Sequence, residues 1–222
     1  MKKVSIIMLV HNAPEYVKLA IDSVVEHTKG VDYELIVVDN RSHFPTRLLL
    51  KKMKKEGKIH KLLLSRKNLL FAKGNNAGSL LTDEESTHYL LLNSDVEIRS
   101  DRWLEYLLEL CPEGGISSYG MVDHAPVRAD GYAMLLDRAL YDTYMLDGNY
   151  EWFWSVTKIQ AQALCAGKRV VAVREHEDML HHFGGKSGMV PRNASGMREK
   201  EEVIIGWFEN HQIEIVERVN TK

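Results

Sequence analysis

The sequence predicts an α/β fold in which a mostly parallel central sheet carries helices on both faces. The first observation is that β-rich and helix-like segments alternate over roughly the first hundred residues. The second is that the strand-like segments are apolar almost throughout, as is typical of strands buried on both faces of a parallel sheet. The third is that these segments end in polar residues. Because parallel strands present their carboxyl ends at one edge of a sheet, we expect a ligand site there.

The first part of the chain follows the order β-α-β-α-β. We expect strands at 4–10, 33–40 and 59–65, and a second helix at 45–58. The first helix should begin with Asn12 as its cap, Pro14 in its first turn, and Glu15 at the position of a capping-box carboxylate. Apolar residues at helical spacing give this helix one buried face: Val17, Ala20, Ile21, Val24 and Val25.

The remaining elements are predicted less regularly. A helix that begins near Ala72 leads into a strand at 88–93. The later expectations are a helix at 101–110, a strand at 131–137, a helix at 152–166, a strand at 168–173, a loop at 175–188, and a terminal appendage at 202–219. A chain of 222 residues with 45% hydrophobic residues can bury one substantial core, so we expect a single domain.

Composition restricts the classes of partner. The formal net charge is −2, which gives no overall field to attract nucleic acid or an anionic membrane. No apolar segment approaches the roughly 20 residues that span a bilayer, so any membrane association would be peripheral. Cys111 and Cys165 are too few for a disulfide scaffold, which fits a reducing compartment. We expect a cytoplasmic protein without a nucleic-acid partner, and peripheral contact with the cytoplasmic membrane face stays open.

Three short motifs are rejected on spacing. "GGKS" (184–187) lacks the earlier glycine of a phosphate-binding loop, because Leu180 stands at that position. "HEDMLH" (176–181) separates its histidines by five positions, one more than a zinc-protease helix requires. "KGNNAG" (73–78) lacks the glycine spacing of a dinucleotide fingerprint, so no hydride-transfer cofactor is predicted.

The strand ends give the main site prediction. Four segments should bring polar groups to the same edge of the sheet: His11-Asn12, Asp39-Asn40, Asn68, and Asn93-Ser94-Asp95. A turn aspartate is the ordinary explanation for Asp95 alone. The convergence of the four segments favours a ligand site instead.

Taken in order, four of these stretches resemble the nucleotide-sugar half of inverting GT-A glycosyltransferases of family 2. They are "VSIIMLVHNAPEYVKLAIDSV" (4–24), "ELIVVDNRS" (34–42), "NLLFAKGNNAG" (68–78) and "LLLNSDVEI" (90–98). The resemblance continues more weakly through "DGYAMLLDRALYD" (130–142), "YEWFWS" (150–155), "AGKRVVAV" (166–173) and "HHFGGKS" (181–187). It implies one GT-A domain over 1–222, with a nucleotide-sugar-binding half (1–99), an acceptor and catalytic half (100–190) and a C-terminal appendage (191–222). A rhamnosyltransferase-like subgroup is one option.

The resemblance implies a metal site at the end of the fourth strand. Asp95 matches the carboxylate of the Asp-X-Asp-type motif that holds a divalent cation on the donor's diphosphate, while Asn93 replaces the first acid and Ser94 lies between them. His181 or His182 matches a histidine near the metal. Such a cation, Mn²⁺ or Mg²⁺, neutralises the charge left on the phosphate oxygens when a nucleoside diphosphate departs. Imidazole favours manganese.

The resemblance also implies donor contacts elsewhere. His11, Asn12 and Asp39 should line the base and ribose, and Asp39 can accept from a ring N–H group. Lys73 or Asn75 should contact the nucleotide, in a segment whose glycines let the backbone approach the donor. Leu70 replaces a commonly occurring glycine there. For His11 and Lys73, ordinary surface positions are the competing interpretation.

Inversion needs a carboxylate that takes the proton of the acceptor hydroxyl. The family's acidic pair is matched by Glu151-Trp152, so Glu151 is the predicted base, with Asp147 in reserve; the ordinary alternative is a helix-start glutamate. The aromatic residues at 152–154 could stack on acceptor sugars or belong to the core. Lys186 and Ser187 lie in a loop that could close over the diphosphate.

These expectations combine into one function. The resemblance implies a metal-dependent inverting glycosyltransferase that moves a sugar from a UDP- or dTDP-linked donor to a hydroxyl of a glycan or glycolipid. Two alternatives remain: a degenerate GT-A domain that binds nucleotide sugar or a partner without catalysis, and a sugar nucleotidyltransferase. The latter would need a basic glycine-rich loop after the first strand, where none is present. A homo-oligomer stays open.

Overall fold

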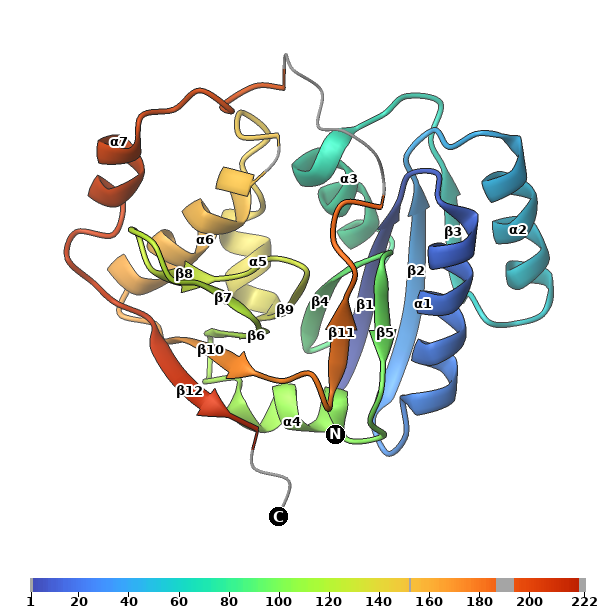
Figure 1. Ribbon diagram of the computed structural model, residues 1–222, viewed down its shortest axis with the longest axis horizontal. Helices are drawn as coiled ribbons and strands as arrows, with labels where there is room; N and C mark the ends of the chain where they lie inside the picture. The colour runs from blue at the N-terminus through green and yellow to red at the C-terminus, as the bar shows by residue number, and fades with distance from the viewer. Residues whose placement is uncertain (1, 152, 187–193, 220–222) are drawn as a thin grey trace.

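An eight-stranded sheet organises the chain, in the order β12-β10-β6-β9-β4-β1-β2-β3 (Figure 1). The computed structural model describes residues 2–151, 153–186 and 194–219. Only β9 runs antiparallel to its two neighbours, and the other neighbours in this sheet are parallel. Its strands are β1 (Lys3–Val10), β2 (Asp32–Asp39), β3 (Lys61–Leu64), β4 (His88–Asn93), β6 (Ile116–Tyr119), β9 (Ala133–Asp137), β10 (Val170–Glu175) and β12 (Glu214–Arg218). The predicted mostly parallel sheet is confirmed.

Helices cover both faces of this sheet, as the sequence predicts. The helices are α1 (Pro14–His27), α2 (Phe44–Lys55), α3 (Leu70–Ser79), α4 (Trp103–Leu110), α5 (Arg138–Tyr144), α6 (Phe153–Cys165) and α7 (Glu201–Gly206). Strand alternation decides the layers, because Ile6 and Met8 of β1 join a core with α1, α2 and α4, whereas Ile7 joins a core with α3, α5 and α6. All three side chains are fully buried.

The glycines of "KGNNAG" serve packing between α3 and β1. A Cβ atom at Gly78 would lie 2.5 Å from Ile7 Cγ2, and one at Gly74 would overlap Leu9 Cδ1. Replacement by a larger residue would therefore force the Ile7 or Leu9 side chain, or the helix itself, to move. These contacts provide a structural reason for the glycines that does not involve a ligand.

In three places the structure contains strands or helices that the sequence analysis does not predict. The stretch predicted as a loop at 175–188 contains β11 (Leu180–His182), because it pairs antiparallel with β5 (Val96–Ile98). The terminal segment supplies α7 and β12, and β12 extends the central sheet beside β10. A short antiparallel hairpin, β7 (Met121–Val122) and β8 (Arg128–Ala129), precedes β9.

The expected cap of α1 is also wrong. The residue before the helix is Ala13, and no side chain caps it. Asn12 has a left-handed φ of 58°, and its Oδ1 atom accepts a hydrogen bond from the backbone N–H of His43 instead. The side chain thus joins the loop after β1 to the loop after β2.

Within the described ranges, no helix combines the length and the apolar character that crossing a bilayer requires.

Candidate functional site

The polar ends of the first strands meet at one edge of the sheet. The His11 Nδ1 atom lies 2.9 Å from the carbonyl oxygen of Asn40, and the backbone N–H of Asn12 donates to Ser42 Oγ at 2.8 Å. The Asn40 side chain in turn accepts from the backbone N–H of Leu69, at the end of the loop that leads into α3. The predicted convergence is therefore confirmed, and these side chains hold the loops after β1, β2 and β3 together.

Asp39, the predicted contact for the nucleotide base, is fully buried at the end of β2. Its Oδ1 atom accepts from the backbone N–H of Ser42 at 3.1 Å. Its Oδ2 atom lies 3.2 Å from Arg47 Nε, although the two groups are not aligned for a hydrogen bond. The structure thus places Asp39 in an ion pair with Arg47, with one carboxylate oxygen that accepts no hydrogen bond.

Leu70, at the position where the resemblance expects glycine, keeps a glycine-like backbone. Its φ is 57°, in the left-handed region that costs a non-glycine residue about 1–2 kcal/mol. Asn75 is buried in the same helix, where its side chain donates to the carbonyl oxygen of Phe71 at 2.9 Å. Asn75 therefore faces its own helix in this conformation.

The end of β4 carries the most concentrated polar cluster. Asp95 is 4% exposed, and its Oδ1 atom lies 3.2 Å from His182 Nε2. Its Oδ2 atom accepts from the backbone N–H of Lys186 at 3.1 Å. The Asn93 Nδ2 atom lies 3.3 Å from the same His182 nitrogen. The pairing of β5 with β11 produces this arrangement, because His182 is opposite Val96, the neighbour of Asp95.

The Asp95 carboxylate and the His182 imidazole could supply part of the coordination shell of a divalent cation. Burial opposes ionisation of Asp95, but hydrogen bonds from His182 and the Lys186 backbone outweigh it and hold the pKa of Asp95 below its ordinary value. A carboxylate and an imidazole leave several coordination positions for phosphate oxygens and water, as Mg²⁺ and Mn²⁺ sites commonly require. No group of three or more acidic, His or Cys side chains that could hold a metal ion occurs in the described part of the chain.

The two adjacent histidines point to different partners. His182 faces Asp95, whereas the Nδ1 atom of His181 lies 2.8 Å from Glu177 Oε2 on the exposed side of the strand. Strand alternation explains the difference. Of the two predicted metal ligands, the structure brings only His182 to Asp95.

Tyr132 holds the imidazole of His182 in position. The two rings stack with centroids 4.2 Å apart, and the Tyr132 hydroxyl lies 2.6 Å from His176 Nε2. The other ring nitrogen of His176 lies 2.9 Å from the carbonyl oxygen of Arg174. If Nδ1 of His176 donates to that carbonyl, Nε2 accepts the proton of the tyrosine hydroxyl. A chain of contacts thus connects β10 to the candidate metal ligand.

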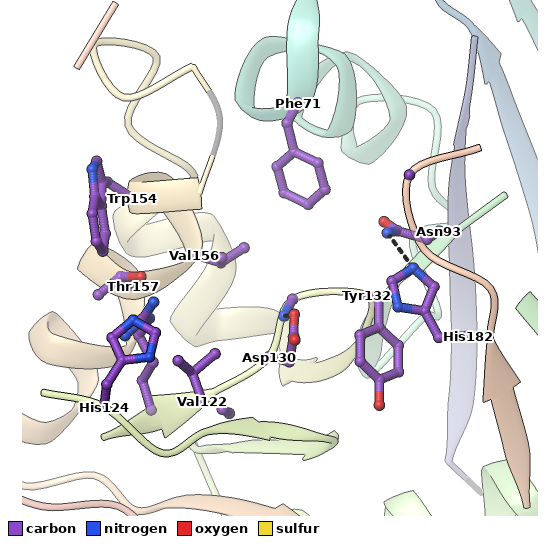
Figure 2. Close-up of a pocket in the computed structure, with 14 residues that line it drawn as sticks. Phe71, Asn93, Val122, His124, Asp130, Tyr132, Trp154, Val156, Thr157 and His182 are labelled. Carbon is purple, nitrogen blue, oxygen red and sulfur yellow. Dashed lines mark hydrogen bonds between the residues drawn. The ribbon is translucent and has the colours of Figure 1, made fainter. Parts of the chain in front are cut away.

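A cavity of about 690 Å³ opens beside this cluster. Figure 2 shows Asn93, Tyr132 and His182 at one end and Trp154 and His124 at the other, with Phe71 above. The lining comes from α3, the end of β4, the β7–β8 hairpin, the start of β9, α6 and β11. Its described walls therefore combine the two halves of the sheet, as a donor and acceptor site would require.

Asp130 supplies the only carboxylate among the described residues that line this cavity. Its Oδ1 atom accepts from the backbone N–H of Gly131 at 2.7 Å, and Figure 2 shows the side chain between Val122 and Tyr132. Asp130 precedes β9, whose antiparallel direction brings the start of the strand to the edge where the parallel strands end. The sequence did not single out this residue or Tyr132.

Arg128 forms the wall at the far end of the cavity. It is 8% exposed, and its guanidinium carbon lies 5.2 Å from the centre of the Trp154 ring. It donates to the carbonyl oxygen of Pro126 at 2.9 Å. Burial lowers the pKa of Arg128, and the charge of Asp130 partly opposes that effect. This end of the cavity therefore combines an aromatic face with positive charge.

Glu151, the predicted base, is not part of the cavity lining. Its Oε1 atom lies 3.0 Å from Lys73 Nζ, and its Oε2 atom accepts from the backbone N–H of Ser195 at 2.8 Å. The Ser195 hydrogen bond and then the Lys73 ammonium lower the pKa of Glu151. The reserve acid Asp147 pairs with Lys158 at 2.6 Å. Both predicted acids thus already have partners.

Only some of the remaining residues that were predicted to belong to the site lie within the described structure. Trp154 lines the cavity, as an acceptor-stacking residue would. Trp152 and Ser187 lie outside the described residues, as does the side chain of Phe153. The Lys186 ammonium lies 5.4 Å from the centre of the Tyr16 ring, above α1. Ser94 is buried between Asn93 and Asp95.

Comparison with known proteins decides the family. The model of glycosyl transferase family 2 matches residues 5–162. The chain belongs to this family. Among curated protein sequences, none matches the chain. The mostly parallel sheet with helices on both faces is that of a GT-A glycosyltransferase, as solved structures of similar fold also indicate.

Three solved structures illustrate that fold. Glucosyl-3-phosphoglycerate synthase from Mycobacterium tuberculosis has a TM-score of 0.63 at 13% identity, covering 84% of this chain and 75% of that one. The mannosyltransferase PcManGT from Pyrobaculum calidifontis has a TM-score of 0.61 at 13% identity, covering 76% and 54%. Residues 1–349 of S. aureus TarS give 0.58 at 16% identity, covering 73% and 55%. The chain thus spans about half of PcManGT and of residues 1–349 of TarS, and 33% of the longer TarS chain.

Proposed function

We propose that this family 2 member transfers a sugar from a nucleoside-diphosphate donor to a hydroxyl of a glycan or glycolipid acceptor, with inversion and with a divalent cation. The observation that carries the proposal is the 3.2 Å approach of the Asp95 carboxylate to His182 beside a cavity of about 690 Å³. The solved structures support the donor class, because those of similar fold were obtained with GDP-Man and Mn²⁺, with UDP, and with Mn²⁺, UDP and phosphoglyceric acid.

Asp95 and His182 would hold the cation, Mn²⁺ or Mg²⁺. When bound, it would neutralise charge that develops on the diphosphate oxygens. Asn93 would remain as an uncharged hydrogen-bonding group near the diphosphate or ribose. We place the base and ribose near His11, Asn12 and Asp39, and a UDP or dTDP donor fits the ability of Asp39 to accept from a ring N–H group.

The proton of the acceptor hydroxyl goes to a carboxylate in this proposal. The hydroxyl oxygen forms a bond with the anomeric carbon while the bond to the diphosphate oxygen breaks on the opposite side. We place Asp130 in the role of base, because it lines the cavity and Glu151 does not. Glu151 is the alternative base, and in this proposal its ion pair with Lys73 positions α3 beside the loop that contains Glu151.

The test is release of nucleoside diphosphate from a panel of UDP-, dTDP- and GDP-sugars, with Mn²⁺, Mg²⁺ or a chelator. We expect metal-dependent turnover with at least one donor and its loss in Asp95→Asn. The anomeric configuration of the product, measured by NMR, tests inversion. Equal turnover with the chelator, or retention of configuration, would contradict the corresponding part of the proposal.

A binding domain without catalysis is the second candidate. It is favoured by the occupied carboxylates of Glu151 and Asp147 and by the uncharged Asn93. Tight, metal-dependent binding of nucleoside diphosphate without release from any donor would support it. The two candidates share the site and differ only in turnover, so one set of binding and hydrolysis measurements separates them.

A further inference from the structure

The segment from the end of β2 through α2 and β3 to the loop before α3 carries the most uneven charge of the chain. Residues 41–68 contain ten Lys or Arg residues and one acidic residue, Glu56, which gives a formal charge of +9. Because the whole chain has a net charge of −2, the rest of the molecule carries −11. The near-neutral total therefore conceals one strongly basic region, and local fields of this kind attract anionic partners.

The outward face of α2 combines this charge with exposed apolar groups. Phe44 and Leu48 are 75% and 55% exposed, and Lys51 and Lys55 are also exposed. At 3.6 residues per turn, these four positions fall within an arc of about 60°. The opposite side of the helix holds its buried residues: Thr46, Leu50 and Met53. Helix α2 is thus anchored on one side and amphipathic, with a mixed apolar and basic surface, on the other.

Half of these ten cations have partners within the protein. Arg47 pairs with Asp39, Lys58 with Asp22, and Lys61 with Glu34. Lys52 lies 3.8 Å from Glu56, and Lys54 donates to the carbonyl oxygen of His60 at 2.6 Å. In the described part of the chain, the side chains of Lys51 and Lys55 form no ion pair with an acidic residue, and neither do those of Arg41, Arg66 and Lys67. Their charge is therefore directed to solvent.

The position of this surface relates it to the site. Figure 1 shows α2 at one end of the molecule, beside β3, which is an edge strand of the sheet. Arg41 follows β2, and Arg66 and Lys67 follow β3, so these residues lie at the carboxyl edge of the sheet. The same edge carries Asp95 after β4. A partner that contacts both loops and the start of α2 would lie at the same edge of the sheet as the candidate site.

We propose that this surface, defined by α2 with Arg41, Arg66 and Lys67, docks on a membrane that contains anionic phospholipid. Lysine and arginine attract anionic headgroups, while Phe44 and Leu48 provide side chains that enter the boundary between headgroups and acyl chains. A nucleic acid would use the charge but leave the exposed phenyl and isobutyl groups without a favourable environment. The combination of the two therefore favours lipid.

The proposal goes beyond the proposed transfer reaction and does not depend on it. Docking in this orientation would keep the carboxyl edge of the sheet at the membrane, where a lipid-linked acceptor would be found. Vesicle binding can be measured without a sugar donor or an acceptor. An inactive protein that binds vesicles would refute the transferase proposal alone, and an active protein that does not bind them would refute the docking proposal alone.

The experiment is co-sedimentation of the full chain with vesicles of equal parts phosphatidylglycerol and phosphatidylcholine, and with phosphatidylcholine alone. We expect binding to the anionic vesicles only, weakened by added salt. Each basic residue near an anionic surface contributes on the order of 1 kcal/mol. Lys51→Gln with Lys55→Gln should therefore weaken partitioning about thirtyfold, at about 1.4 kcal/mol per tenfold change. Phe44→Ser with Leu48→Ser should also weaken it, because the apolar insertion is lost.

Matched controls remove similar groups from the other end of the molecule. Val203 and Ile205 on α7 are each 42% exposed, and Lys168 and Lys200 are exposed. Val203→Ser with Ile205→Ser and Lys168→Gln with Lys200→Gln should bind vesicles as the unaltered protein does. The substituted α2 residues are all exposed, and an unchanged unfolding midpoint verifies the fold of each variant.

Three results would overturn the proposal. The first is that the protein does not bind the anionic vesicles. The second is that the control variants lose as much vesicle binding as the α2 variants. The third is that the protein binds duplex DNA or RNA instead of vesicles, through Lys51 and Lys55 but not through Phe44 and Leu48.

Discussion

The choice of catalytic base can be decided by a pair of isosteric substitutions. Asp130→Asn removes the single carboxylate that lines the described walls of the cavity, and the amide that replaces it keeps an oxygen for the Gly131 N–H. General base catalysis typically contributes about 10²–10⁴-fold, or roughly 3–5 kcal/mol of barrier. We expect Asp130→Asn to reduce turnover by that factor and to leave the affinity for nucleoside diphosphate nearly unchanged.

Glu151→Gln should behave differently. It removes the charge that pairs with Lys73, whose side chain is 53% exposed, so the loss in the free energy of unfolding should not exceed about 1 kcal/mol. We expect turnover to fall by less than about tenfold. The assay is steady-state release of nucleoside diphosphate under saturating donor and metal. Near-normal turnover in Asp130→Asn together with a loss of about 10²-fold or more in Glu151→Gln would refute this reasoning and restore Glu151 as the base.

Three further predictions follow from contacts elsewhere. Tyr132→Phe keeps the ring that stacks on His182 and should change the metal-dependent affinity for nucleotide little. Tyr132→Leu should weaken that affinity about 10- to 100-fold, measured by calorimetry, because it removes the ring that supports the candidate metal ligand His182. Gly78→Ala should lower the free energy of unfolding by about 1–3 kcal/mol through its contact with Ile7; Gly206→Ala, which meets no neighbour, is the control and should not destabilise. Burial opposes ionisation of Glu34, but hydrogen bonds from Lys61, Ser5 and the Asp83 backbone prevail and lower its pKa. The stability that this carboxylate provides is therefore fully present above its unfolded pKa near 4.5 and is lost as the pH falls through the lower folded value. In denaturant titrations, the free energy of unfolding should exceed that of Glu34→Gln by about 1.5–3 kcal/mol near neutral pH, and this difference should shrink below pH 4.5. A difference that grows as the pH falls would contradict the lowered pKa of Glu34.

The parallel half of the fold was predictable because its signals are local. Apolar strands, helical spacing and polar strand ends fix β1 to β4 and the helices between them, and parallel pairing then places the end of β4 beside the end of β1. The prediction that Asn12 caps α1 is wrong because its side chain instead accepts a hydrogen bond from the loop after β2. The sequence shows that residue 12 has an amide side chain, but it does not show that the backbone N–H of His43 is its partner.

The acceptor side was less predictable, because it depends on strand direction. Asp130 reaches the cavity only because β9 runs antiparallel, and nothing in "DGYAMLLD" reveals that direction. The pairing of β11 with β5 likewise decides between His181 and His182, and two adjacent histidines in a presumed loop carry no such signal. Glu151 was predicted from the family resemblance, and its contacts with Lys73 and Ser195 arise from tertiary structure.

The basic region of α2 could have been found in the sequence. Counting charge over the whole chain gave a near-neutral protein, whereas counting over residues 41–68 gives +9. The exposure of Phe44 and Leu48, however, required the structure, because the same residues at helical spacing would fit a buried face equally well.

The central claim is that the Asp95 carboxylate and the His182 imidazole hold a divalent cation against the diphosphate of a sugar nucleotide. Anomalous diffraction at a manganese-sensitive wavelength, from crystals grown with Mn²⁺ and UDP, tests it most directly. The account predicts one strong peak within bonding distance of an Asp95 carboxylate oxygen, a His182 nitrogen and phosphate oxygens. A manganese ion bound to the diphosphate but remote from both side chains would contradict it.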